Sequence, residues 1–256
     1  MDASACLVVG RDGRGTSVAT TMRGEAPLLM RMTQPATSAS PAVQVHLVGG
    51  AAGPLGGDRL HLSIEVGADS SLAMRSVAAS LAQPGRVGAP PSSTTIRAEV
   101  RSGACLDWWP EPLVSVRGSD HRQVTDVAAA DETAVVRWVD EIVLGRHDEP
   151  GGVLTTRQRV TVAGRPVLHH AARFDPLTDG IGRHGTARVL VTGILVGRPS
   201  LRSLSVIASD HRIARYPLDE RCTAWIALAE SVDVARAALV AAGLERCSIV
   251  GPEIAT

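Results

Sequence analysis

The chain has 256 residues, a formal net charge of +0 and 45% hydrophobic residues, enough apolar material for one large domain or two small ones. It contains no lysine, which excludes a Walker A phosphate loop and every enzyme that forms a lysine Schiff base. The balanced charge argues against a nucleic-acid-binding protein, because such proteins normally carry a basic surplus. Aromatic residues are only 2%, and asparagine is missing too, a joint depletion typical of a GC-rich genome.

The cysteines and the apolar stretches indicate the compartment. Cys6, Cys105, Cys222 and Cys247 are widely spaced and form no CxxC pair, which is typical of reduced thiols in a cytosolic protein. The N-terminus lacks the basic and apolar regions of a signal peptide. The longest apolar stretches, such as 189–196, fall far short of the roughly 20 residues that span a bilayer. We therefore expect a soluble cytoplasmic protein with neither membrane nor nucleic-acid partners.

Alternation of apolar and polar residues with a period of two dominates the chain and predicts strands. Residues 59–66 alternate without error, 95–101 repeat the pattern, and 158–168 form a hairpin around Ala163-Gly164. Shorter β-rich runs, in chain order, are 5–9, 17–22, 27–31, 42–48, 70–77, 113–117, 123–127, 133–139, 188–196 and 203–207. Many short strands with frequent turns predict an all-β sandwich, barrel or solenoid.

Helical signals concentrate near the C-terminus. Ser231 is a good N-cap for a helix that Gly243 would end, and residues 222–230 predict a second helix just before it. A shorter helix or turn is expected at 139–146. The expected architecture is a single domain over 1–256, mainly β over 1–218, with a helical segment at 219–245.

A glycine-rich loop at 48–58 includes Gly56 and Gly57 and ends at Asp58. A nucleotide-binding glycine loop needs a helix after it, and here a strand follows, so the pattern favours a tight turn between two strands. Asp58 at the end of such a loop either caps backbone amides or faces a ligand.

Residues 103–111 hold two of the four tryptophans in a chain poor in aromatics. Trp108 and Trp109 are core or interface anchors, and packing of at least one in the core is favoured. Asp107 and Glu111 bracket the pair.

The densest group of potential metal ligands lies at 138–152 and comprises Asp140, Glu141, His147, Asp148 and Glu149. No HExxH, zinc-finger or EF-hand spacing occurs, so a solvated acidic loop is favoured over a permanent metal site. A β-rich hydrolase or isomerase that uses this acidic cluster with His147 is the alternative from a different class. No G-x-S-x-G nucleophile motif is present to support it.

Several motifs, in order, resemble those of the UreD (UreH) family of urease accessory proteins. They are Gly-Gly-Asp58-Arg-Leu, Gly-Ala at 67–68, Ala-Ala at 78–79, Gly-Ala-Cys-Leu-Asp107-Trp-Trp-Pro-Glu111, and Glu141-Ile-Val-Leu-Gly-Arg146. The resemblance covers roughly residues 40–175. It implies a β-solenoid-like body with a couple of helices and a non-catalytic scaffold.

The family resemblance also implies partners and a metal in transit. Such a scaffold assembles with UreF and the GTPase UreG on the apo-urease subunits, and nickel passes through the assembly without a permanently bound cofactor. Weak oxygen ligands suit such passage, because a thiolate cage would trap the ion. The resemblance places the route at Asp58, Asp107, Glu111 and Glu141, with Arg146 ordering a carboxylate. An adaptor with no part in nickel transfer is the second alternative.

Overall fold

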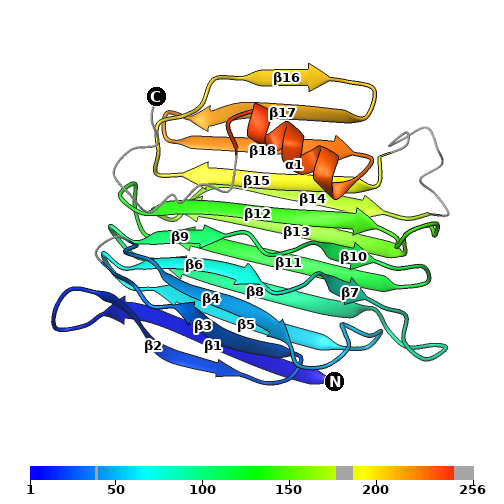
Figure 1. Cartoon of the computed structure of the whole chain (residues 1–256), viewed down its shortest axis with the longest axis horizontal. Helices are drawn as coiled ribbons and strands as arrows, with labels where there is room; N and C mark the ends of the chain where they lie inside the picture. The colour runs from blue at the N-terminus through cyan, green and yellow to red at the C-terminus, as the bar shows by residue number, and fades with distance from the viewer. Residues whose placement is uncertain (38–39, 177–186, 245–256) are drawn as a thin grey trace.

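Two β-sheets packed face to face form the body of the chain in a computed structural model that describes residues 1–37, 40–176 and 187–244 (Figure 1). The seven-stranded sheet has the order β14-β13-β11-β8-β5-β1-β2, and the eleven-stranded sheet has the order β16-β17-β18-β15-β12-β9-β6-β4-β3, with β7 and β10 paired beside that path. Cys247 lies outside the described residues.

The strands of the seven-stranded sheet are β1 (Asp2–Arg11), β2 (Ser17–Gly24), β5 (Arg59–Val66), β8 (Ser92–Val100), β11 (Asp120–Ala129), β13 (Val153–Val162) and β14 (Arg165–Phe174). Those of the eleven-stranded sheet are β3 (Leu28–Gln34), β4 (Val43–Gly49), β6 (Ser71–Ser76), β7 (Ser80–Ala82), β9 (Cys105–Trp108), β10 (Leu113–Ser115), β12 (Val135–Leu144), β15 (Val189–Val196), β16 (Leu204–Ile207), β17 (His211–Asp219) and β18 (Cys222–Ala229).

The chain coils between the two sheets as a β-solenoid. From β5 to β13 it alternates between them, so that β5, β8, β11 and β13 stack in parallel in one sheet and β6, β9 and β12 in the other. The strand β1 extends the first stack in parallel, and the later strands β14, β15, β17 and β18 add antiparallel pairs. The mainly β, solenoid-like expectation is confirmed.

Strict alternation along β5 and β8 creates the core. Leu60, Leu62, Ile64 and Val66 of β5 are buried, and the intervening side chains face outward. In register with them, β8 buries Ile96, Ala98 and Val100 against the opposite sheet. The hairpin between β13 and β14 turns at Ala163 and Gly164, whose φ values of 50° and 74° are those of a tight type I′ turn.

Two expected helices are strands, which corrects the sequence analysis. Residues 222–230 were predicted as a helix, but β18 (Cys222–Ala229) pairs with β15 and β17. The segment 139–146 was predicted as a short helix or turn, but β12 continues through it to Leu144. Both strands are buried on both faces, so their apolar runs lack the alternation that marks a strand.

The one helix among the described residues is α1 (Val232–Ala241), and its predicted caps are confirmed. The Ser231 hydroxyl accepts a hydrogen bond from the Val234 amide, and Gly243 adopts φ 70° just beyond the helix. The expected helical segment 219–245 thus holds a strand followed by one helix. Within the described ranges, no helix is long and apolar enough to cross a membrane.

The helix lies over the outer face of the eleven-stranded sheet, in front of β15, β17 and β18 (Figure 1). Its buried residues Ala235 and Leu239 pack with Trp109, Val191 and Trp225 in a second apolar layer. The described residues therefore form a main core between the sheets and a second core beneath α1, with a smaller apolar cluster around Ile142, Leu154 and Phe174.

The second core leaves no room for a side chain at Gly193, because a Cβ there would overlap the indole ring of Trp225. We expect Gly193→Ala to lower the free energy of unfolding by roughly 1–3 kcal/mol through overpacking. Urea unfolding followed by tryptophan fluorescence measures the change. Gly13→Ala is the control, since nothing lies within 4 Å of a Cβ at that position; equal stability of the two variants would contradict this packing.

Candidate functional site

The parallel pairing of β9 with β12 brings the tryptophan segment next to the acidic segment. In register, Asp107 lies opposite Arg137 and Trp108 opposite Trp138. Because side chains alternate along a strand, Trp108 and Trp138 point into the core between the sheets, whereas Trp109 packs in the layer beneath α1. Acidic groups thus come together on both faces of one sheet.

Asp107 is buried and bound by two arginines. Arg137 donates through Nε and Nη2 to both carboxylate oxygens, at 2.8 and 2.7 Å, and Arg75 donates to one of the same oxygens. Asp107 is only 1% exposed. Its buried charge is stabilised because the two guanidinium groups supply the hydrogen bonds that water would otherwise make. The predicted nickel ligand is therefore already engaged by cations.

Asp140 lies against the stacked rings of Trp108 and Trp138, whose centroids are 4.5 Å apart. The indole N–H of Trp138 donates to Oδ2 at 3.1 Å and that of Trp108 to Oδ1 at 3.4 Å. Burial raises the pKa of Asp140 to about 6, and the two indole hydrogen bonds oppose that rise. Among the described residues no cation forms an ion pair with this carboxylate, in contrast to Asp107.

Arg236 of α1 joins two carboxylates from distant parts of the chain. Its Nη2 donates to Glu111 Oε2 and to Glu141 Oε2, each at 2.8 Å. The indole of Trp109 also donates to Glu141 Oε1 at 2.6 Å, and the Glu141 side chain has no exposed surface. This ion-paired group ties α1 to the sheet and holds both glutamates beside each other.

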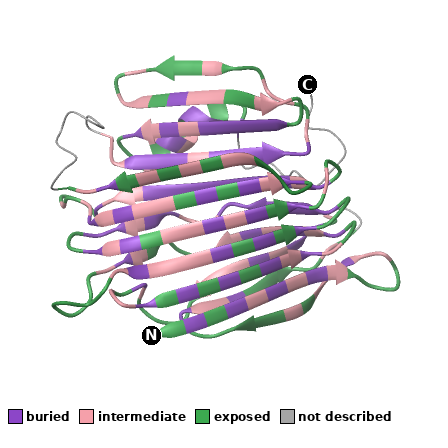
Figure 2. Cartoon of the chain, turned by 180° about the vertical axis from the view of Figure 1, so that it is seen from behind, coloured by how far each residue is buried: buried purple, intermediate pink, exposed green. Residues whose placement is uncertain are grey.

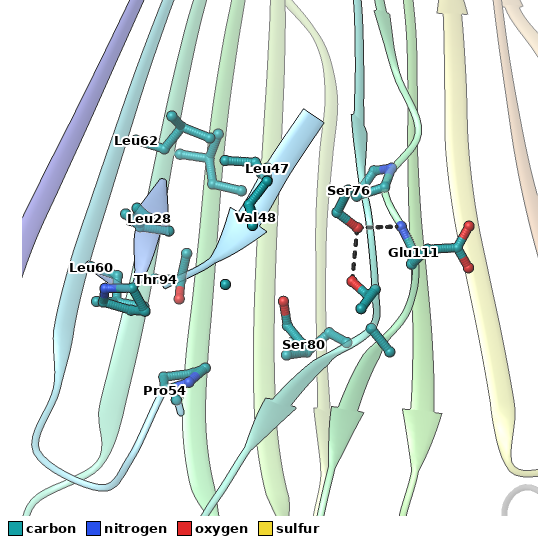
Figure 3. Close-up of a pocket in the computed structure, with 18 of the residues that line it drawn as sticks. Leu28, Leu47, Val48, Pro54, Leu60, Leu62, Ser76, Ser80, Thr94 and Glu111 are labelled. Carbon is teal, nitrogen blue, oxygen red and sulfur yellow. Dashed lines mark hydrogen bonds between the residues drawn. The ribbon is translucent and has the colours of Figure 1, made fainter. Parts of the chain in front are cut away.

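A cavity of about 280 Å³ lies between the two sheets and reaches these acids. One side is apolar, with Leu28, Leu60 and Leu62, and the other carries Ser76 and the backbone of Glu111, whose carboxylate points away from the cavity (Figure 3). The Ser76 hydroxyl accepts a hydrogen bond from the Glu111 amide at 2.8 Å. The further polar residues that line the cavity are Ser80, Thr94, Gln123, Asp140 and Glu141.

The inner faces of β11 and β13 carry further buried polar groups. His121 Nε2, Thr125 Oγ1 and the Gln158 side-chain amide make no hydrogen bond with the described residues. Burial lowers the pKa of His121 to about 4, so its imidazole is neutral. Burial also raises the pKa of Cys105 to about 12, which keeps this thiol protonated and a poor metal ligand.

Asp58 occupies a different place, at the end of the glycine loop. Its carboxylate accepts hydrogen bonds from the Met1 ammonium and from the Leu55 amide, both at 2.9 Å. Within the described part of the chain its partners are not shared with Asp107, Glu111 or Glu141. Gly56 faces the loop at 83–91 so closely that a Cβ would lie 2.6 Å from the Gly85 nitrogen, and Gly57 has φ 90°.

His147 is not assembled with the buried acids. Its side chain is 94% exposed, and its ion-pair partner is the equally exposed Asp148 at 3.0 Å. Arg146 pairs with both oxygens of Glu149, at 2.9 and 3.2 Å, in the same turn. Over residues 1–37, 40–176 and 187–244, no group of three or more His, Cys, Asp or Glu side chains is positioned to hold a metal ion.

Sequence reasoning missed the partners that complete the site. Asp140 was part of the acidic segment but was not chosen, although its spacing of two from Trp138 places both on one face of a strand. Arg137 and Arg75 were not considered because their pairing with Asp107 depends on strand register. Arg236 is 95 residues from Glu141, and no local pattern connects them.

Comparison with known proteins defines the class of this fold and site. A family model described as UreD urease accessory protein matches residues 1–250. A urease accessory protein UreD of Parafrankia sp. is 41% identical over 222 residues, covering 76% of this chain and 73% of that protein. The UreD of Frankia casuarinae is 44% identical, with coverages of 76% and 70%. That of Frankia alni is also 44% identical, over 63% of this chain and 59% of its own length.

The solenoid with its buried acid–tryptophan cluster is that of a non-catalytic maturation factor. The chain belongs to the UreD family of urease accessory proteins and acts in urease maturation. The exposed His147, far from any buried acid partner, offers no support for the hydrolase alternative.

The buried ion pair predicts a large effect of removing the Asp107 charge. Asp107→Asn removes the buried anion that Arg137 and Arg75 share, and we expect a loss of roughly 3–5 kcal/mol in the free energy of unfolding. Glu65→Gln, which removes an exposed partner of Arg101, is the matched control and should change stability by less than about 1 kcal/mol. Urea denaturation compares them; a small effect of Asp107→Asn would contradict a buried structural pair.

The raised pKa of Asp140 predicts a pH dependence of stability. The carboxyl has an ordinary pKa of 3.8 and a pKa of about 6 in the fold, so between those values the folded chain binds a proton that the unfolded chain releases. The free energy of unfolding therefore falls as pH rises from about 4 to about 6, and this contribution is constant above.

The variant Asp140→Asn should lack that contribution, so the stability difference between it and the unaltered chain should change across this pH window and then become constant. Urea titrations at a series of pH values measure the difference. Parallel pH profiles of the two proteins would show that Asp140 titrates normally in the fold.

Proposed function

We propose that this chain assembles in the cytoplasm with UreF and UreG on the apo-urease subunits and helps to pass nickel to the urease active site. The observation that carries the proposal is the cavity between the sheets, which Asp140 lines, together with the paired Glu111 and Glu141 carboxylates beneath α1 on the other face of the same sheet. Because the chain has no lysine, a Walker A loop for GTP is excluded in it, and the nucleotide chemistry belongs to a partner.

The donor set suits an ion that must arrive and leave. Carboxylate oxygens bind Ni²⁺ less tightly than thiolates, and the protonated Cys105 thiol does not compete with them. The unpaired polar atoms of His121, Thr125 and Gln158 favour a hydrated interior, since buried polar groups need water or a ligand as partner. A hydrated interior lowers the free-energy penalty for a cation.

The four predicted carboxylates have unequal environments on this route. Glu111 and Glu141 share Arg236, so a nickel ion near them competes with one guanidinium. Asp140 accepts two indole hydrogen bonds and forms no ion pair with a described residue, and we add it to the route. Asp58 and Asp107 remain predicted members, although the Met1 ammonium and two arginines respectively engage them.

A paired variant tests the route. We expect Glu111→Gln combined with Asp140→Asn to lower the nickel content and activity of urease several-fold when the chain is co-expressed with the urease subunits, UreF and UreG. Assembly should be unchanged by size-exclusion chromatography. Nickel is measured by plasma mass spectrometry of the purified urease.

Asp148→Asn is the matched control, because Asp148 is an exposed carboxylate whose left-handed backbone, φ 57°, suits asparagine. Full nickel loading of urease by the Glu111→Gln/Asp140→Asn variant in an intact complex would contradict the route. The chain would then be an adaptor with no part in metal transfer. Failure of the unaltered chain to bind UreF would contradict the assembly itself.

A further inference from the structure

The outer face of the seven-stranded sheet has no element of the described chain covering it. Figure 2 views this face from behind, where exposed and partly exposed positions alternate with buried ones along β5, β8, β11 and β13. The helix α1 lies on the opposite side of the molecule (Figure 1). The outward side chains of this sheet are therefore available to a partner.

Strand register aligns arginines across this face. Arg97 of β8 lies opposite Asp126 of β11, and Asp126 lies opposite Arg159 of β13. Arg157 is two residues from Arg159 on the same face, and Arg122 is an outward residue of β11. With about 4.8 Å between neighbouring strands, these side chains form one basic patch.

The arginines of this patch are not ion-paired within the part of the chain that the structure describes. Arg97, Arg122, Arg157 and Arg159 make no ion pair with any described residue, although Asp126 lies between two of them in register. In contrast, Arg101 at the edge of the same sheet pairs with Glu65 and Glu99. Asp126 is thus outnumbered by the four arginines around it, and the patch carries a surplus of positive charge.

A depression of about 450 Å³ adjoins the patch at β1, β5 and β8. Short side chains, Cys6, Ser63 and Thr95, belong to its lining, and Arg23 and Arg97 are its arginines. Arg23 lies opposite Cys6, and Ser63 lies between Cys6 and Arg97 in register. The one acid of the lining, Glu25, already accepts hydrogen bonds from the amide and hydroxyl of Ser4.

We propose that this basic face, centred on Arg97, Arg157 and Arg159, is a docking surface for an acidic segment of a partner protein. Guanidinium groups bind carboxylates through two parallel hydrogen bonds, and an array at strand spacing meets several carboxylates at once. The depression beside Arg97 accommodates a side chain of the segment.

A nucleic acid is the less suitable occupant. Single strands bind proteins largely by stacking on aromatic rings, and no aromatic residue occupies an outward position on β1, β5, β8, β11, β13 or β14. Phe174, the one aromatic residue in these strands, is buried. The charge complementarity therefore favours a protein segment rich in aspartate and glutamate.

Binding of a fluorescein-labelled oligoglutamate peptide to the full chain, followed by fluorescence anisotropy at low salt, tests this surface. We expect saturable binding that weakens as salt rises, and no binding of an oligoglutamine peptide. The triple variant Arg97→Gln/Arg157→Gln/Arg159→Gln should weaken binding on the order of tenfold.

The matched control is Arg14→Gln/Arg86→Gln/Arg202→Gln, which removes the same charge from exposed positions elsewhere and should leave binding nearly unchanged. Equal weakening by both triple variants, or no peptide binding by the unaltered chain, would overturn the proposal. Tighter binding of duplex DNA or of phosphatidylserine vesicles than of the peptide would overturn it as well.

If the triple variant does not fold by circular dichroism, Arg157→Gln is compared with Arg86→Gln in the same assay, with a smaller expected difference of the same sign. Peptide binding requires neither nickel nor urease, so its failure leaves the nickel route unaffected.

Discussion

The structure depends most on the in-register pairing of β9 with β12. That pairing places Asp107 against Arg137 and stacks Trp108 on Trp138, so that Asp140 can accept both indole hydrogen bonds. A slip of one residue would turn every one of these side chains to the opposite face and leave buried charges without partners. The contacts that fix this strand register therefore also assemble the acidic group.

Charged side chains are distributed unevenly between the two sheets. The eleven-stranded sheet buries acids beside arginines and indoles, around a cavity with a polar side. The seven-stranded sheet directs unpaired arginines to its outer face. The two proposals thus assign a cation route to the interior and an acidic partner to the outer face of a lysine-free maturation factor.

The period of the apolar pattern predicted the elements that have one face exposed to solvent and the other buried. The strand at 59–66 and the turn at Ala163-Gly164 were predicted correctly, as were the caps of α1. Residues 222–230 were predicted as a helix, because their alanines and leucine are good helix formers and both faces of the strand they form are buried. Among the site residues, the motifs indicated Asp107, Glu111 and Glu141. The sequence held no signal for Arg236, because a contact across 95 residues depends on the tertiary fold.

The claim that nickel crosses the interior of this chain is tested most directly by locating the metal. Crystals of the chain assembled with its urease partners, soaked in Ni²⁺ and measured at the nickel absorption edge, would show anomalous density wherever the ion stops. The account predicts a peak within coordination distance of Asp140 in the cavity between the sheets, or of Glu111 and Glu141 beneath α1 on the other face of the same sheet. Density confined to the outer surface, with an empty cavity, would contradict it.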